Sequence, residues 1–476
     1  MRRPTIIILS CMSFIAGTIV GYNFLFSPNF WWTVFCIFSA LASLLLSRRL
    51  KFIPIVLCGA VLGLAIITYQ QNYISQYGLS GSTYKKLEIS GDVKGDPYWD
   101  KDRNYVFTLT NLNVDGSSRV GDVRIKTFSS AVKEGYRVTV VGKIFPIMAK
   151  PGYQISYGTV KIASFNQPVM VMAKQLFYSG IDRSLEESPA GFLKGILVGA
   201  RSSLPLPLQQ TLNEVGLSHI VAVSGYNLTI LVVILQRLLK KRWLWASLII
   251  SLALVWSFTI LTGASASILR AAVMATVFLI ASYYGRPLSV FTCISITAAI
   301  TLLINPSSAV EDIGWQLSFL SLTGIVVLAP IITTILPKKT PLLSDLVAVT
   351  FAAQIATVPY LLYLFGSYSI ASIISNMVLM PIIPLMMLAG FLIAIVGILA
   401  PSWGYILASP LAKLISIIFD FLQYLQSQKG LIVVVRPQTY VLVIWYLLIC
   451  ILGAIVYHHN LDTSLASFQM PDRLVK

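Results

Sequence analysis

The sequence predicts a polytopic α-helical membrane protein, with about 10–12 membrane helices and one small β-barrel domain inserted outside the bilayer. Of its 476 residues, 56% are hydrophobic and 11% charged, and the mean hydropathy is +0.79, far above that of a soluble globular protein. Apolar runs close to the length that crosses hydrocarbon recur along the chain. One stretch, 70–168, instead alternates short apolar runs with turn residues, which is typical of β-strands.

The composition narrows the chemistry that the chain can perform. Its five cysteines are scattered through apolar runs, with no pair at zinc-ligand spacing. Of its three histidines, His219 stands alone, whereas His458 and His459 are adjacent at the end of an apolar run. No phosphate-binding G-x-x-x-x-G-K-[ST] loop is present. We therefore expect no metal, no cofactor and no catalytic residue, and the composition excludes a disulfide scaffold and intrinsic disorder.

Residues 1–69 are predicted to form a three-helix membrane anchor, with apolar segments at 5–22, 30–46 and 52–68. Basic residues precede the first segment and separate the second from the third (Arg2, Arg3, Arg48, Arg49 and Lys51). Cytoplasmic loops of membrane proteins are enriched in such residues. The third segment is therefore expected to run outward, so that residues 70–168 lie on the outer face.

Residues 70–168 are predicted to form a small closed barrel of the OB type, although a small sandwich would give the same pattern. Runs such as 106–109 and 137–141 are separated by Gly, Asp and Asn. The stretch carries 13 basic and eight acidic residues, a net charge of +5, with aromatic residues interspersed. Cations mixed with aromatic rings are typical of surfaces that bind single-stranded nucleic acid without sequence preference.

We assign that surface to the following residues: Lys94, Lys101, Arg103, Arg124, Lys126, Arg137, Tyr98 and Trp99. The alternative is an ordinary solvated strand, because the run Val123-Arg124-Ile125-Lys126 places both cations on the solvent face.

The rest of the chain is predicted to contain an interfacial amphipathic helix at 169–188, a helical membrane domain at 189–457 and a polar tail at 458–476. The domain's apolar runs are 217–239, 244–261, 266–284, 288–304, 313–336, 343–366, 370–399 and 440–457. The run 370–399 is too long for one span and contains Pro381 and Pro384. We therefore expect it to be bent or re-entrant.

Polar and glycine residues interrupt the membrane helix that is predicted to begin near Leu217. Such a break survives at membrane depth only beside protein or water, which favours a helix that lines an aqueous path. The alternative is close helix packing at Ser and Gly. A hydrolytic pair of His219 and Ser224 is disfavoured, because five residues on one helix diverge by about 140°.

The same segment, Glu214 to Leu228, carries a G-L-S-H-x-x-A-x-S-G core and resembles the hallmark of the ComEC competence family of DNA-uptake channels. Further stretches agree with that family in the right order: 189–201, 269–271, 312–325, 354–359, Phe365-Gly366, Ser375-Asn376 and Pro381. The resemblance covers about residues 1–457.

The sequence departs from the family in two respects. Many members carry a C-terminal metallo-β-lactamase-like nuclease, and this chain contains no His-x-His-x-Asp-His cluster. The family's S-G-L-H also reads Ser224-Gly225-Tyr226-Asn227 here.

The resemblance implies a channel that carries single-stranded DNA across the cytoplasmic membrane in natural transformation, and no enzyme. We expect the path to be lined by polar residues of the membrane domain: His219, Ser224, Gly225, Asn227, Arg270, Asp312, Gln316, Gln354 and Asn376. Arg270 in midspan should face the interior or a pore, because a lipid-exposed cation is costly. The alternatives are that Arg270 snorkels or pairs with a buried acid such as Asp345.

The implied partners are single-stranded DNA, membrane lipids, a separate DNA receptor, a pilus, a cytosolic helicase-like motor and a nuclease on another chain. Two other functions stay open. A secondary transporter for a small anionic solute would also use broken helices. A non-catalytic membrane scaffold would not require His219 or Arg270.

Overall fold

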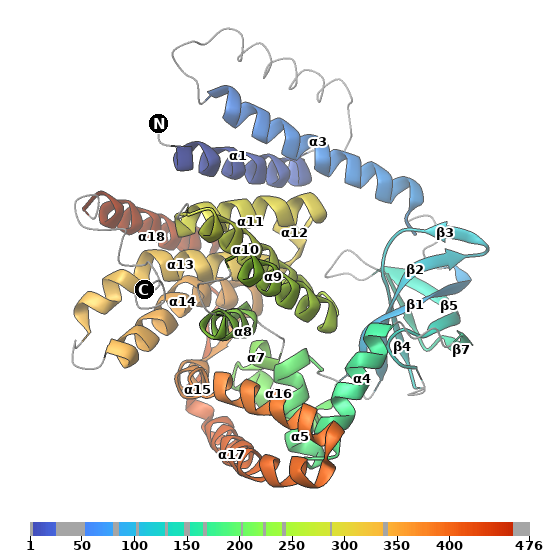
Figure 1. Ribbon diagram of the computed structural model, residues 1–476. Coiled ribbons are helices and arrows are strands. Elements are labelled where there is room, and N and C mark those ends of the chain that lie inside the picture. Colours follow the sequence, from blue (N-terminus) through green and yellow to red (C-terminus); the bar gives the residue numbers. More distant parts are fainter. Residues whose placement is uncertain are drawn as a thin grey trace.

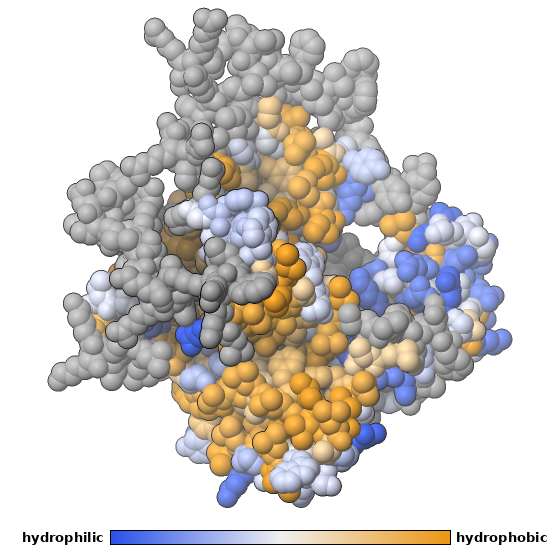
Figure 2. All heavy atoms as spheres, in the orientation of Figure 1, coloured by the Kyte–Doolittle hydropathy of each residue, from blue (hydrophilic) through white to orange (hydrophobic). Residues whose placement is uncertain are grey.

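The computed structural model describes residues 3–24, 53–79, 85–100, 104–128, 132–146, 153–164, 169–200, 203–221, 225–239, 244–285, 288–336 and 341–459. Within these ranges the chain forms a large helical body with a β-domain at one side (Figure 1). Helix α4 (Val169–Asp182) lies between the two. Hydrophilic residues gather over the β-domain and hydrophobic residues over the helical body (Figure 2), as expected for a bilayer-embedded body with a water-exposed domain.

The β-domain is a closed barrel. Its strands are β1 (Lys86–Trp99), β2 (Tyr105–Val114), β3 (Ser117–Arg119), β4 (Val123–Thr127), β5 (Arg137–Pro146), β6 (Tyr153–Ser156) and β7 (Thr159–Ser164). The order β1-β2-β4-β6-β5 closes because β5 also pairs with β1, while β3 and β7 pair only with β2 and β5. Five strands in a closed ring are typical of an OB-type barrel, so the structure favours the barrel over the sandwich.

The predicted alternation of side chains holds on β4. Val123, Ile125 and Thr127 are buried, whereas Arg124 points to solvent. Because successive side chains of a strand face opposite sides, this register fills the barrel with apolar groups. The core that results contains Ile89, Leu109, Ile125, Val138, Ile144 and Ile155, all fully buried.

Two N-terminal helices, α1 (Arg3–Phe24) and α3 (Ile53–Tyr77), pack side by side. Gly17 approaches the backbone of Ala60, and Gly21, one turn later, approaches Leu64. Small residues at four-residue spacing permit such close packing in membranes. The order of these contacts makes the helices parallel, which is compatible with the predicted anchor. Its second segment, 30–46, lies outside the described residues, and α3 continues past the predicted boundary at residue 69.

The helical body contains the apolar helices that the sequence predicts: α8 (Gly225–Leu238), α9 (Leu244–Leu261), α10 (Ala266–Tyr283), α11 (Val290–Ile304), α13 (Ile313–Ile335), α14 (Pro341–Phe365) and α18 (Thr439–His459). Within the described residues, four helices are long and apolar enough to cross a membrane, or five if a bent pair counts as one span. Other apolar helices are shorter. The chain is thus a polytopic helical membrane protein with a small barrel domain.

One spanning helix was absent from the predicted runs. Helix α17 (Pro401–Ser427) is long and apolar enough to cross a membrane, and it buries one face against the body. Its charged residues Lys413 and Asp420 are exposed on the opposite face. These two charges divide its apolar residues into shorter runs, although the composition of the whole helix is that of a membrane span.

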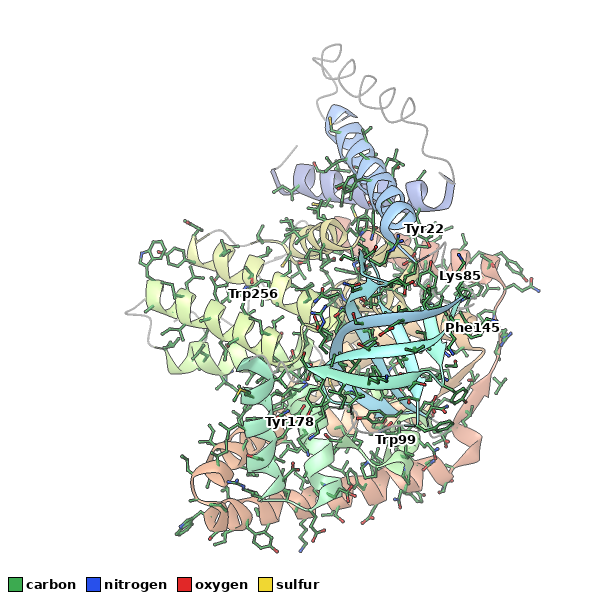
Figure 3. All side chains as sticks on the ribbon, turned by 90° about the vertical axis from the view of Figure 1, so that its right-hand side faces the viewer. Tyr22, Lys85, Trp99, Phe145, Tyr178 and Trp256 are labelled. Carbon is green, nitrogen blue, oxygen red and sulfur yellow. The ribbon has the colours of Figure 1, made fainter. Side chains whose placement is uncertain are left out.

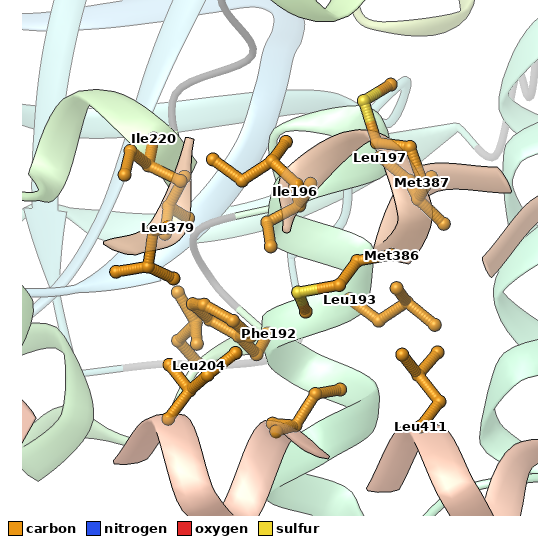
Figure 4. Close-up of a cluster of buried hydrophobic side chains, with 14 of the residues drawn as sticks. Phe192, Leu193, Ile196, Leu197, Leu204, Ile220, Leu379, Met386, Met387 and Leu411 are labelled. Carbon is orange, nitrogen blue, oxygen red and sulfur yellow. The ribbon is translucent and has the colours of Figure 1, made fainter. Parts of the chain in front are cut away.

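A short helix, α5 (Glu187–Val198), is the centre of the largest apolar cluster. Every residue from Ala190 to Val198 is buried, including Lys194. Figure 4 shows Phe192, Leu193, Ile196 and Leu197 of α5 packed against residues of other segments: Leu204, Ile220, Leu379, Met386, Met387 and Leu411. A helix that is apolar all round is stable only when other elements enclose it, so α5 serves as the packing core of this half of the body.

Helix α18 compensates for a proline in α14. Pro359 has no N–H, so the carbonyl of Ile355, four residues earlier, loses its donor within the helix. The indole N–H of Trp445 donates to that carbonyl at 3.1 Å, and the hydroxyl of Tyr446 donates to the Ala356 carbonyl at 2.9 Å. Trp445 and Tyr446 of α18 therefore donate hydrogen bonds to carbonyls in the turn of α14 that precedes Pro359.

We expect Trp445→Phe to lower the free energy of unfolding by about 1–3 kcal/mol, because it leaves the Ile355 carbonyl without a donor. Thermal unfolding of the purified chain in detergent would measure this. Trp403→Phe is the matched control, because Trp403 is 69% exposed on α17 and forms no hydrogen bond with the described residues. In a Pro359→Ala background the restored N–H serves Ile355, so Trp445→Phe should cost less. An equal cost in both backgrounds would contradict this account.

Candidate functional site

The first part of the site is an interrupted helix. Helix α6 (Leu206–Glu214) is followed by Gly216, whose φ of +80° favours glycine, and then by the short helix α7 (Ser218–Val221). Helix α8 begins at Gly225 and includes Asn227. Residues 222–224, between the two helices and including Ser224, lie outside the described residues.

The second part is a bent pair of helices. Helices α15 (Ala371–Leu379) and α16 (Ile383–Leu399) meet at an angle of 54° and together are apolar enough to form one broken span or a re-entrant loop. Pro381 lies in the break and Pro384 in the first turn of α16. This angle confirms the prediction that 370–399 is bent. The cause is proline, which lacks an N–H and cannot continue a regular helix.

The two interrupted segments lie against each other. A Cβ added to Gly216 would lie 2.7 Å from the Cβ of Ser372, so only glycine fits at this contact. The hydroxyl of Tyr226, on the first turn of α8, lies 3.4 Å from the carbonyl of Met380 in the second break. These contacts bring Gly216 against α15 and the first turn of α8 against the break that follows α15. We call this region, where the breaks of α7–α8 and α15–α16 meet, the junction.

His219 faces α15 at the junction. Its Nδ1 lies 3.1 Å from the carbonyl of Gly216, and the residue is exposed. The Asn376 side chain is among the polar groups near the ring.

Asn376 supplies an unsatisfied polar atom at the same place. Its side chain is 6% exposed, and its Oδ1 has no hydrogen-bond partner among the described residues. Nearly all buried polar groups in proteins are paired, so an orphaned amide oxygen requires an explanation.

Two further predicted residues, Gln354 and Gln316, form hydrogen bonds on α14 and α13. Gln354 on α14 accepts a hydrogen bond from the Tyr368 hydroxyl at 2.7 Å and lies 3.4 Å from the Ser372 hydroxyl. Gln316 on α13 donates to the carbonyls of Ala309 and Val310 at 2.9 and 3.0 Å.

The other end of the Gln316 amide connects α13 to α14. Tyr360 directly follows Pro359 on α14, and its hydroxyl donates to Gln316 Oε1. Gln354 and Gln316 are therefore both held by tyrosines on or beside α14. Sequence reasoning missed these tyrosines, whose only signal was their position near predicted polar residues.

Arg270 and Asp312 form an ion pair at the start of α13. The guanidinium lies 3.3 Å from Asp312 and donates to the carbonyl of Gly314 at 2.9 Å. Asp312 also caps α13 by accepting from the Gly314 N–H. Arg270 is buried and paired, with Asp312 in place of the suggested Asp345.

Asn227 and Gly225 lie in packed surroundings. Asn227 is buried and donates to the carbonyl of Ile196, near the end of α5. The last carbonyls of a helix have no partner within it, so Asn227 satisfies one of them. A Cβ on Gly225 would lie 3.1 Å from that of Ala271 on α10. The structure thus gathers His219, Asn376 and Gln354 around the junction and places Arg270 with Asp312 elsewhere.

On the barrel, several predicted DNA-binding cations have acidic partners. Lys126 lies 3.0 Å from Asp100, Lys94 3.5 Å from Asp122, and Arg137 3.8 Å from Asp92. Arg124 is exposed and forms no ion pair with the described residues. Lys101 and Arg103 lie outside the described residues.

Asp100 is held by several donors at one end of the barrel. Burial alone would raise the pKa of this carboxyl, but hydrogen bonds from Asn104 and Lys126 outweigh it and hold the pKa below its ordinary value. The predicted aromatic residues lie nearby: Tyr98 is half-buried, and the Trp99 ring packs edge-on against Tyr105.

Sequence reasoning missed the most exposed aromatic pair of the barrel. The rings of Phe128 and Tyr157 stack with centroids 5.0 Å apart, although the residues are 70% and 60% exposed. Tyr157 has a φ of +60°, an uncommon conformation for a residue with a large side chain. Backbone strain of this kind persists only where the surrounding structure enforces it. The pair brings together the ends of β4 and β6, which sequence order does not reveal.

Buried charges connect the barrel to the helical body. Lys174 on α4 lies 2.7 Å from Glu134 in the loop between β4 and β5. Lys194 on α5 lies 2.6 Å from Asp182 at the end of α4. Both ammonium groups face the ring of Tyr178, which Figure 3 shows beside the barrel. These pairs fix α4 against both the barrel and α5.

The described residues contain no group of three or more His, Cys, Asp or Glu side chains that could hold a metal ion. The site therefore consists of amide, hydroxyl, imidazole and paired ionic groups.

We expect Gly216→Ala to destabilise the chain more than Gly285→Ala, because both glycines have positive φ but only Gly216 faces a close neighbour. A left-handed backbone costs an alanine roughly 1–2 kcal/mol at either position. At Gly216 the methyl group must also displace Ser372. Thermal unfolding of the two variants in detergent measures the difference. Equal losses would show that the contact between Gly216 and α15 contributes nothing.

Comparisons with known proteins identify the family. The family described as "Competence protein" matches residues 196–458, which include both interrupted segments. "ComE operon protein 3" of Bacillus subtilis (strain 168) is 28% identical over 271 residues, or 54% of this chain and 34% of that protein. The chain thus spans about a third of the length of the curated relative that it matches. No solved structure matches. Because the family match covers more than half of the sequence, this chain belongs to the competence protein family.

Proposed function

We propose that this chain is a membrane channel for the uptake of single-stranded DNA across the cytoplasmic membrane during natural transformation. The junction is the observation that carries this proposal, because it lies within the segment matched by the competence family. Irregular backbone at membrane depth is tolerated only where protein or a water-filled cavity satisfies it. The exposed imidazole of His219 can supply a polar group to such a path.

The translocated strand would pass the junction and avoid the lipid. A polyanion cannot cross hydrocarbon, so the path must offer water and polar side chains. His219, Asn376 and Gln354 supply such groups without a net negative charge. Arg270 is neutralised by Asp312, and its contribution would be to hold the start of α13.

The barrel would receive the strand on the outer face. Base stacking on aromatic rings stabilises single-strand binding by about 1–3 kcal/mol per base. Phe128 and Tyr157 offer exposed ring surface for such stacking. The exposed Arg124 can contact phosphate, whereas the acid-paired Lys94, Lys126 and Arg137 contribute less charge than a count of cations suggests.

Other proteins would supply what the described site does not. A separate DNA receptor and a pilus would deliver the DNA, a cytosolic helicase-like motor would pull the strand, and a nuclease on another chain would degrade its complement. Membrane lipids surround the helical body. We propose a transport role without catalysis by this chain.

A secondary transporter of a small anionic solute is the second candidate, because broken helices that meet at a site are typical of such proteins. The barrel favours DNA over a small solute, because a solute carrier has no evident use for an exposed aromatic pair on its outer domain.

Uptake of labelled DNA in cells with and without this gene tests the proposed function. We expect labelled single strands to reach the cytoplasm only when the gene is present. Equal arrival in both strains, with normal DNA binding at the cell surface, would refute the channel.

The barrel's role can be tested with the full chain in lipid nanodiscs and a fluorescent single-stranded oligonucleotide. We expect Phe128→Ala/Tyr157→Ala to weaken binding roughly fivefold or more, because stacking surface is lost. Arg124→Ala should reduce the salt dependence of binding, because it removes one phosphate contact. Tyr424→Ala is the control, because Tyr424 is equally exposed (64%) but lies on α17. Unchanged affinity in the double variant would remove the aromatic pair from the DNA path.

A further inference from the structure

Helix α17 carries polar residues on the side that faces away from the protein. Its buried residues, such as Gly404, Leu411 and Ile418, pack against the body. The outer side carries six exposed polar residues: Ser402, Ser409, Lys413, Ser416, Asp420 and Gln423. At 3.6 residues per turn, these six lie within about 80° of the helix circumference. They form a continuous polar stripe along a helix that is long and apolar enough to cross a membrane.

Two exposed tyrosines mark the depth of the polar stripe in the bilayer. Tyr405 and Tyr424 lie near the two ends of α17, and each is 64% exposed. Tyrosine is enriched where membrane helices meet the interfaces. The 19 residues from one tyrosine to the other correspond to about 29 Å, close to the thickness of the hydrocarbon. Lys413 lies eight residues from Tyr405 and eleven from Tyr424, and therefore near the bilayer centre.

The charges of the polar stripe are unpaired within the part of the chain that the structure describes. Lys413 and Asp420 are exposed and form no ion pair there. A charge this deep in hydrocarbon is costly, and only a long side chain near a helix end can extend to the interface. Helix α17 packs mainly on α16 and lies at the edge of the helical body (Figure 1). The polar stripe therefore requires a covering from outside the described residues.

The remaining parts of this sequence do not fit the polar stripe. Residues 25–52 contain an apolar run but no acidic residue that could pair with Lys413. The other stretches outside the described ranges contain acids only at Asp102, between β1 and β2, and at Asp462 and Asp472, in the polar tail. A second copy, inserted in the same direction, would place its own Lys413 at the same depth. Like charges in contact repel, which disfavours self-association through this surface.

We propose that the polar stripe of α17 docks a membrane helix of another protein. That helix carries a carboxylate at the depth of Lys413 and a basic group near the depth of Asp420. The two charges of α17 are seven residues apart, or about 10 Å along the axis, so the partner's acid and base are separated by two turns. Ser409 and Ser416 permit the helices to approach closely. This surface does not depend on what the channel carries.

Photocrosslinking in cells tests the docking surface. The photoreactive residue p-benzoylphenylalanine replaces Ile417, which is exposed beside the polar stripe, and in the control it replaces Val443, similarly exposed on α18. We expect a discrete adduct with a different membrane protein from position 417 only. Its sequence should contain a membrane helix with an acid and a base two turns apart. An adduct of two copies of this chain, a partner helix without the acid, or crosslinks to lipid alone would overturn the proposal.

Charge exchange tests whether Lys413 selects the partner. Lys413→Glu should reduce the adduct at least tenfold, because two carboxylates would then face each other. Lys413→Arg keeps the charge and should crosslink normally. Replacing the partner's acid with lysine should restore the adduct to Lys413→Glu, and an immunoblot of the membrane fraction measures the amount of each variant. If Lys413→Glu crosslinks as well as Lys413→Arg, the charge does not select the partner and the proposal fails.

Thiol labelling distinguishes a partner helix from a water-filled groove. Ser416→Cys and Gly430→Cys are made in a background without the five native cysteines, because Gly430 is exposed in the turn after α17. In open membrane fragments, a small water-soluble thiol reagent should label position 430 at least tenfold faster than position 416. Equal rates would show that the polar stripe borders water and would overturn the proposal. These experiments use no DNA, so failure of the docking surface and failure of the proposed channel are distinguishable.

Discussion

The rest of the structure depends on one constraint: every backbone group inside the bilayer needs a partner within the protein. Two helical segments of this chain are interrupted, and each interruption frees such groups. In the structure the two segments contact each other: the Tyr226 hydroxyl lies near the carbonyl of Met380, and Gly216 lies against Ser372. Trp445 does the same for the carbonyl that Pro359 frees. Irregular backbone therefore gathers at the junction, where polar side chains can also be accommodated.

The elements that local physics determines could be predicted from the sequence. Alternation along β4, the bend around Pro381 and the break before Gly225 each follow from a few neighbouring residues. Helix α17 was missed although its length and composition mark it as able to cross a membrane. Lys413 and Asp420 divide its apolar residues into shorter runs, and both lie on its exposed face.

The sequence indicated which polar residues to consider for the candidate site, but it did not indicate which residues they contact. Arg270 is marked as unusual because it is a charged residue in an apolar run. Its acidic partner, however, is Asp312, 42 residues later at the N-terminus of α13. The number of cations in the barrel likewise predicted a DNA-binding surface. That number does not show that Lys126 is paired with Asp100. Partners are set by tertiary contacts, and sequence separation hides them.

A series of polar contacts leads from the barrel to the junction. Glu134 of the barrel holds Lys174 on α4, Asp182 at the end of α4 holds Lys194 on α5, and Asn227 of α8 holds the end of α5. Lys174 and Lys194 are largely buried, and a buried charge is costly unless paired, so each of the two ion pairs favours one arrangement of its elements. Helix α5 is enclosed on all sides and cannot shift without disturbing its neighbours. The position of the first turn of α8, where Tyr226 contacts the second break, is thus coupled by packing and ion pairs to the position of the barrel.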